Sequence, residues 1–102
     1  MPDPGVRRLD SARVLRHLGL REQIHPYDAF VYAFPDRDSF EASAKRDREI
    51  HGNDVLGPYE TEEGVVGISD IRSQLRAQGF AATDPALPDD VHSPVFRPLA
   101  AD

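Results

Sequence analysis

The residue types best suited to chemistry cluster at His51-Gly52-Asn53-Asp54, where a histidine precedes an amide and a carboxylate. An imidazole beside a carboxylate can bind a metal ion or transfer protons in acid–base catalysis. The spacing matches no zinc or calcium signature, and a histidine in the last turn of a helix also interacts favourably with the helix dipole. We therefore interpret the segment as the surface end of a helix and predict no metal site and no cofactor.

Ser69 is the one serine in a setting that suggests a nucleophile. The run Gly67-Ile68-Ser69-Asp70-Ile71 places it after a short apolar segment, as in the strand-to-helix turn of a nucleophile elbow, but Ile71 replaces the second glycine of that motif. We therefore predict that Ser69 is the N-cap of a helix. The chain has no cysteine, phosphate-binding loop or dinucleotide fingerprint, so no catalytic residue is identified and an enzyme is the less favoured interpretation.

Charge is unevenly distributed in this acidic chain, whose formal net charge is −6. The segment 53–70 has no basic residue, and Tyr59 supplies an aromatic anchor in the middle of it. An acidic loop 54–63 of this kind favours a basic surface on a partner protein, although it could equally be a solvated loop. We predict a small regulatory interaction protein that binds its partner through five residues: Asp54, Tyr59, Glu60, Glu62 and Glu63.

Basic residues concentrate at the other end of the chain, in and around an expected first helix. They are Arg7, Arg8, Arg13, Arg16 and Arg21. Such a helix could contact nucleic acid, but on an acidic domain it can also pair with the domain's own acidic loop or with that of a neighbouring subunit. We favour this pairing and expect no direct binding to nucleic acid.

A second functional hypothesis is a small enzyme or ligand-binding domain whose pocket lies between a sheet and its helices. Tyr32, His51 and Tyr59 would supply polar groups to such a pocket. Asp47 lies on a narrow apolar helix stripe, where it is either a buried functional carboxylate or the margin of the stripe.

The run from Phe30 to Asp36, followed by a helix that contains Phe40, supports this second hypothesis by its pattern. Over about twenty residues it resembles a strand-helix unit of small ferredoxin-like dimeric α+β barrel proteins. The resemblance includes no diagnostic motif and therefore transfers no site residue to this chain.

Two strands and three helices must position these residues. The apolar run Ala29–Phe34 predicts a central strand, with Phe30, Tyr32 and Phe34 on one face and small residues on the other, and 64–68 predicts a second strand. Helices are expected over 12–18, capped by Asp10 or Ser11; over 39–51, capped by Asp36 or Asp38; and from Ser69 to Gly79. The fold class is α+β or small α/β, in the order α-β-α-β-α-(β), with two to four strands in one sheet. Helical connections between the two confident strands predict that they run parallel.

Prolines and charge delimit one domain. We expect a disordered tail over 1–8, a compact core over 9–83 and a proline-rich extended tail over 84–102 in which Val91 to Phe96 forms an edge strand. Two confident strands make a poor sheet, so we favour a homodimer that completes it. No apolar run approaches the roughly 18 residues of a membrane span, which predicts a cytoplasmic protein, and eleven arginines against the single Lys45 suggest a bacterial or phage origin.

Overall fold

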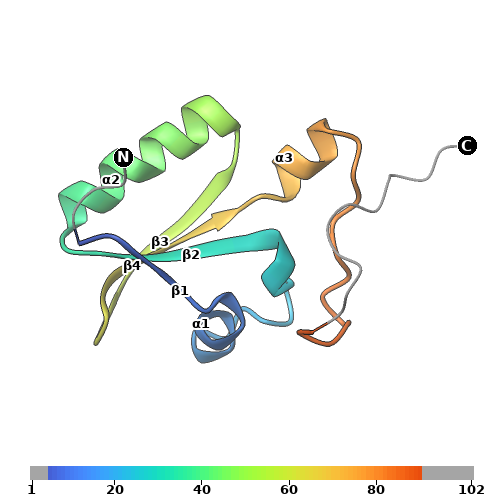
Figure 1. Ribbon diagram of the computed structural model, residues 1–102, viewed down its shortest axis with the longest axis horizontal. Helices are drawn as coiled ribbons and strands as arrows, with labels where there is room; N and C mark the ends of the chain where they lie inside the picture. The colour runs from blue at the N-terminus through green and yellow to red at the C-terminus, as the bar shows by residue number, and fades with distance from the viewer. Residues whose placement is uncertain (1–4, 91–102) are drawn as a thin grey trace, which may run out of the picture.

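The computed structural model describes residues 5–90 as a four-stranded sheet flanked by helices (Figure 1). The strands pair antiparallel in the order β1-β2-β4-β3. The elements, in chain order, are β1 (Arg7–Leu9), α1 (Ser11–His17), the 3-10 turn η1 (Pro26–Asp28), β2 (Ala29–Phe34), α2 (Arg37–Arg46), the π-helical turn η2 (Asp47–His51), β3 (Asp54–Thr61), β4 (Gly64–Asp70) and α3 (Arg72–Ala77). The predicted α+β fold with one sheet of up to four strands is confirmed.

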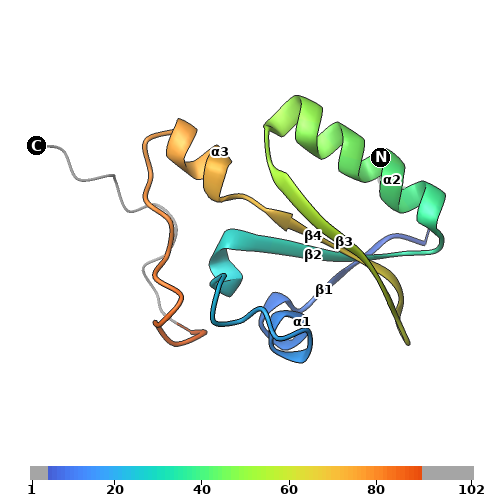
Figure 2. The same cartoon turned by 180° about the vertical axis from the view of Figure 1, so that it is seen from behind.

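Strand β2 occupies the interior of the sheet between β1 and β4, as its two apolar faces predict. Alternation along a strand sends Ala29, Val31 and Ala33 to one face, where they form a core with α1. Phe34, on the opposite face, packs with residues of α2. Figures 1 and 2 accordingly show α1 and α2 on opposite sides of the sheet.

The relative direction of the strands differs from the sequence prediction, because β2 and β4 are antiparallel rather than parallel. The segment 54–63, expected to be an acidic loop, contains the edge strand β3, which forms a hairpin with β4. The hairpin reverses the chain and inserts β4 between β2 and β3. Gly57-Pro58 lies at a register shift between Leu56 and Tyr59 within this pairing.

The first helix follows its local signals. The Asp10 side chain caps α1 by accepting a hydrogen bond from the backbone N–H of Ala12. Gly19 adopts a left-handed conformation with φ of 76°, and the N–H of Leu20 donates to the carbonyl of Leu15 at 2.8 Å. Helix α3 ends in the same way, with the N–H of Phe80 donating to the carbonyl of Leu75 at 2.9 Å.

Two other helix limits were predicted wrongly. Ser69 is not an N-cap, because Ser69 and Asp70 continue β4, and α3 begins only at Arg72. Helix α2 is capped by Asp36 and ends at Arg46, where the chain widens into η2. Ile50, which the expected helix over 39–51 includes, lies in this wider turn and is 70% exposed.

The ends of the described chain also depart from expectation. The expected tail over 1–8 is wrong at its end, since Arg7 and Arg8 belong to β1 and pair with Ala33 and Tyr32. Residues 84–90 lie beside the segment that follows α1, where Arg21 contacts Leu87 and Asp89, while the expected edge strand Val91 to Phe96 lies outside the described residues. Within residues 5–90, no helix is long and apolar enough to cross a membrane.

Candidate functional site

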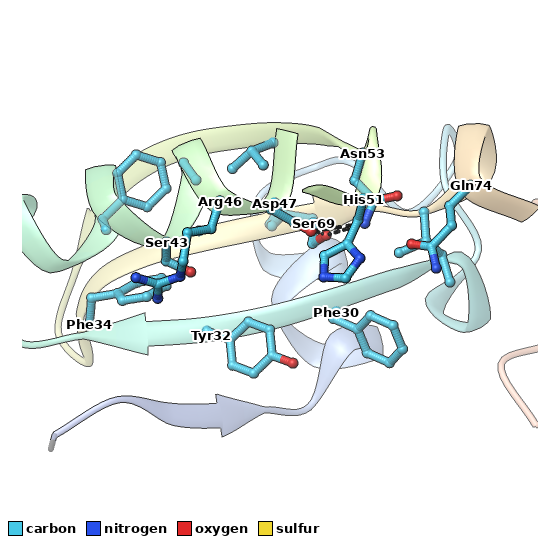
Figure 3. Close-up of a pocket in the computed structure, with 16 residues that line it drawn as sticks. Phe30, Tyr32, Phe34, Ser43, Arg46, Asp47, His51, Asn53, Ser69 and Gln74 are labelled. Carbon is cyan, nitrogen blue, oxygen red and sulfur yellow. Dashed lines mark hydrogen bonds between the residues drawn. The ribbon is translucent and has the colours of Figure 1, made fainter. Parts of the chain in front are cut away.

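A pocket of about 370 Å³ lies between the sheet and the α2–η2 segment (Figure 3). It brings together Tyr32 from β2 with Asp47 and His51 from η2, three residues that the sequence proposed for such a pocket. The fourth, Tyr59, packs against the core on the α1 side of the sheet and does not line the pocket. The other polar residues that line the pocket are Ser43, Arg46, Asn53, Ser69 and Gln74.

The aromatic side chains of β2 form one wall of the pocket. Phe30, Tyr32 and Phe34 share a face because side chains alternate along a strand. Phe34 is buried, and its ring meets that of Phe40 edge-on, with centroids 5.7 Å apart. Phe30 and Tyr32 are only partly buried, so their rings remain available to a ligand. The guanidinium of Arg8 lies 4.6 Å from the centroid of the Phe30 ring.

Strand β4 supplies the floor beside this wall. The pairing register places Ser69 opposite Phe30 and Gly67 opposite Tyr32. A Cβ atom at Gly67 would lie 2.6 Å from Cε1 of Phe40, closer than real side chains approach. Glycine is therefore required for Phe40 to close the end of the pocket against the sheet.

Asp47 lies at the centre of a polar network at the inner side of the pocket. The Ser69 hydroxyl donates to Oδ2 of Asp47, and Nδ2 of Asn53 donates to Oδ1 at 2.9 Å. Asn53 is 5% exposed, and its Oδ1 accepts no hydrogen bond from any residue in the described part of the chain. The network fixes η2 to β4, and Asp47 is thus more than the margin of an apolar stripe.

Gly52 ends η2 and sets the direction in which the chain leaves it. It has a left-handed φ of 69°, a conformation that glycine adopts without strain. This turn leaves His51 exposed at the mouth of the pocket and buries Asn53 beside Asp47. Single π-helical turns of this kind are frequent at functional sites.

Ser69 and Arg46 are among the pocket residues that the sequence interpretation missed. Ser69 was considered as a nucleophile and assigned to a helix cap, whereas it reaches Asp47 from the sheet, 22 positions away in sequence. Arg46, next to Asp47 in the sequence, also lines the pocket. No local pattern shows either role, because each depends on how α2 and η2 lie across β4.

The acidic residues proposed for partner binding are partly engaged within the chain. Glu63 pairs with Arg13 at 2.9 Å and with Arg7 at 3.7 Å, and Glu60 pairs with Arg37 at 3.3 Å. Arg13 of the first helix therefore pairs with the domain's own acidic segment, as favoured from the sequence, whereas Arg16 and Arg21 pair with Asp89. Asp54 and Glu62 are exposed on the same hairpin.

A second polar cluster, formed by His25 and Asp28, lies away from the pocket and is completely buried. Burial raises the pKa of Asp28, although the backbone N–H of Thr83, which donates to its Oδ2 at 2.8 Å, acts in the opposite direction. Nε2 of His25 lies 2.8 Å from the Pro88 carbonyl oxygen, and Nδ1 lies 3.2 Å from the backbone N of Tyr27. These contacts attach residues 83–88 to the domain.

No family model, curated protein or solved structure matches the chain. Among residues 5–90, no group of three or more histidine, cysteine or acidic side chains is arranged to hold a metal ion. We therefore infer function from the geometry of the pocket and the chemistry of its lining.

Proposed function

We propose that this chain is a small-molecule-binding domain whose site is the pocket between β2, β4 and the α2–η2 segment. The observation that carries the proposal is the convergence of Tyr32, Asp47 and His51 on one cavity of about 370 Å³. Ligand pockets typically have volumes of about 300–1,000 Å³ and combine apolar walls with a few polar groups. This cavity falls at the small end of that range and has the same mixture of groups.

Binding is favoured over catalysis because Ser69 is buried and no histidine base reaches its hydroxyl in the described structure. The Ser69 hydroxyl donates to Asp47, and His51 makes no hydrogen bond to either residue in the described structure. An activated serine needs a base within hydrogen-bond reach, positioned in turn by a third group. The Ser69–Asp47 contact instead supports the shape of the pocket.

The experiment that tests this proposal is a thermal-shift screen of metabolites against the full chain and two helix α2 variants. Ser43→Leu places a larger side chain in the pocket, whereas Ala42→Leu makes a similar change at an exposed neighbouring position outside its lining. A ligand at a hundred times its Kd stabilises the folded state by about 2.7 kcal/mol.

We expect a stabilising ligand to lose its effect on Ser43→Leu and to keep it on Ala42→Leu. Equal responses of the two variants would place the ligand elsewhere on the domain and contradict the proposal.

Binding of a basic partner protein through the acidic hairpin is a second candidate. It is supported by the position of β3 at the edge of the sheet, where an outer strand presents unpaired backbone groups, and by the exposed Glu62, which forms no ion pair with the other described residues.

Glu62→Lys should weaken salt-sensitive binding to a purified native partner, while the control Glu41→Lys, on the exposed surface of α2, should not. Unchanged binding of Glu62→Lys at low salt would count against this candidate.

The compartment, the origin and the assembly of the protein stay predictions. A cytoplasmic location and a bacterial or phage origin are those expected from the sequence. The argument for a homodimer assumed that the chain underfills its sheet, but one chain supplies four strands by itself. Light scattering on the full chain tests the homodimer.

A further inference from the structure

The pocket presents two aromatic rings that the protein covers only in part. Phe30 and Tyr32 are partly exposed, whereas Phe34 and Phe40 at the other end of the pocket are 5% and 2% exposed. Figure 3 shows the Tyr32 and Phe30 rings side by side along β2, below the side chain of His51. Flat ring surfaces of this kind favour a flat ligand, which can stack on them or meet their edges.

Arg46 supplies a positive charge at this wall. It extends from the last turn of α2 toward the aromatic side chains of β2 (Figure 3) and forms no ion pair with any described residue. Other arginines of this acidic chain do form ion pairs, among them Arg37 with Glu60 and Arg72 with Asp70. A guanidinium group can donate two parallel hydrogen bonds to one carboxylate or phosphate group.

A second guanidinium lies on the same face of the sheet. Arg8 pairs in register with Tyr32 and covers part of the Phe30 ring at 4.6 Å from its centroid. It too makes no ion pair within residues 5–90. Arg8 and Arg46, which belong to different elements, therefore make the open side of the aromatic wall electropositive.

The single acidic residue of the pocket lining is already occupied. Asp47 accepts hydrogen bonds from Ser69 on one oxygen and from Asn53 on the other. The side chains of Arg46 and His51 and the Tyr32 hydroxyl form no hydrogen bond with other described side chains. The groups left free for a ligand include more hydrogen-bond donors than acceptors, which favours an anion over a cation.

We propose that the pocket binds a small planar organic anion, with its ring against Phe30 and Tyr32 and its anionic group on Arg46. This inference rests on the proposed ligand-binding function and specifies the chemical class of the ligand. An aromatic carboxylate and a nucleoside monophosphate share this chemistry, and both are small enough for a cavity of about 370 Å³.

The test is a titration of the ¹⁵N-labelled full chain in which binding is monitored by the amide chemical shifts. The probes of each set have the same ring system but differ in charge. The naphthalene probes are 2-naphthoate, neutral 2-naphthalenemethanol and cationic 2-naphthylmethylamine, and the nucleotide pair is AMP with adenosine. In at least one pair we expect the anion to bind about tenfold more tightly than the neutral ring, the size of one charge-assisted interaction. The pair that shows this preference distinguishes a carboxylate ligand from a phosphate ligand.

Arg46→Gln should remove this preference and leave binding of the neutral probe unchanged. The matched control is Arg48→Gln, an exposed arginine two positions further along that does not line the pocket, and it should keep the preference. Equal losses in the two variants would show a general effect of surface charge and overturn the inference.

The two proposals fail in different ways. Equal binding of the anionic and neutral probes, or tighter binding of the cation, would overturn the planar-anion inference and leave the ligand-binding function standing. Absence of binding by every probe, together with a screen in which Ser43→Leu behaves as the parent chain, would overturn both.

Discussion

Substitution of Gly67 by alanine tests how the pocket is built. The added methyl group would lie 2.6 Å from Cε1 and 2.7 Å from Cδ1 of Phe40, and 3.3 Å from Cε2 of Phe34. Phe40 is 2% exposed and Phe34 is 5% exposed, so neither ring can swing into solvent. The clash must therefore be relieved by moving α2 away from β4 or by turning the Phe40 ring into the pocket that it lines.

The size of the effect follows from two opposing contributions. Overpacking a filled core by one methyl group destabilises a protein by about 1–3 kcal/mol. Replacing a glycine restricts the unfolded chain and returns about 0.4–1 kcal/mol. The net loss is roughly 1–2 kcal/mol in the free energy of unfolding, or a decrease of roughly 5–15 °C in Tm for a domain of this size.

Urea unfolding of Gly67→Ala, Phe40→Leu and the double variant measures this clash directly. Phe40→Leu destabilises by itself because it leaves a cavity, but it also makes room for the methyl group. The double variant should therefore be more stable than the sum of the two single effects predicts, by at least about 1 kcal/mol. Strict additivity, or a Gly67→Ala variant as stable as the parent, would refute the packing argument.

Three further predictions concern groups outside the pocket wall. Burial raises the pKa of Asp28, so its ionised form is less stable in the folded chain than in the unfolded one. As the pH is lowered through the folded-state pKa, the free energy of unfolding of the parent chain should therefore rise relative to that of Asp28→Asn. Urea midpoints measured at several pH values check this, and a difference that is constant with pH would contradict it. Arg21 donates to the carbonyls of Pro85 and Leu87 at 2.6 Å each. Arg21→Ala should therefore lower the free energy of unfolding by about 1–3 kcal/mol and speed hydrogen exchange of the Thr83 amide. Unchanged exchange would show that residues 83–88 are held by other contacts. Glu63→Ala should change stability by less than about 1 kcal/mol in thermal unfolding because its ion pairs are partly exposed, and a larger loss would mean that they hold the hairpin in place.

The parts of the fold that depend on short stretches of chain were predictable. The two apolar faces of Ala29–Phe34 identified the central strand, because the two-residue period of a strand is visible in the sequence itself. The ends of α1 and α3 were predictable for the same reason, since a left-handed glycine followed by an apolar residue forms its hydrogen bonds within one turn.

The elements set by pairing with distant residues were not predictable from local pattern. β3 is an edge strand of mixed polarity with an irregular register, so it has neither the apolar run nor the clean alternation that marks a strand. Without it, the direction of β4 relative to β2 was predicted wrongly. Ser69 shows the consequence for the pocket, because its partner Asp47 is known only once β4 is placed beneath η2.

The amide shifts that 2-naphthoate and 2-naphthalenemethanol produce in the full chain show directly whether this pocket is the ligand site. We expect saturable changes at Tyr32, Asp47, His51 and Ser69 that give one common Kd for each probe. The amide of Arg13, on the opposite side of the sheet, should not move. Saturable changes centred on α1, or no saturable change up to about 10 mM of either probe, would contradict the assignment of this pocket as the ligand site.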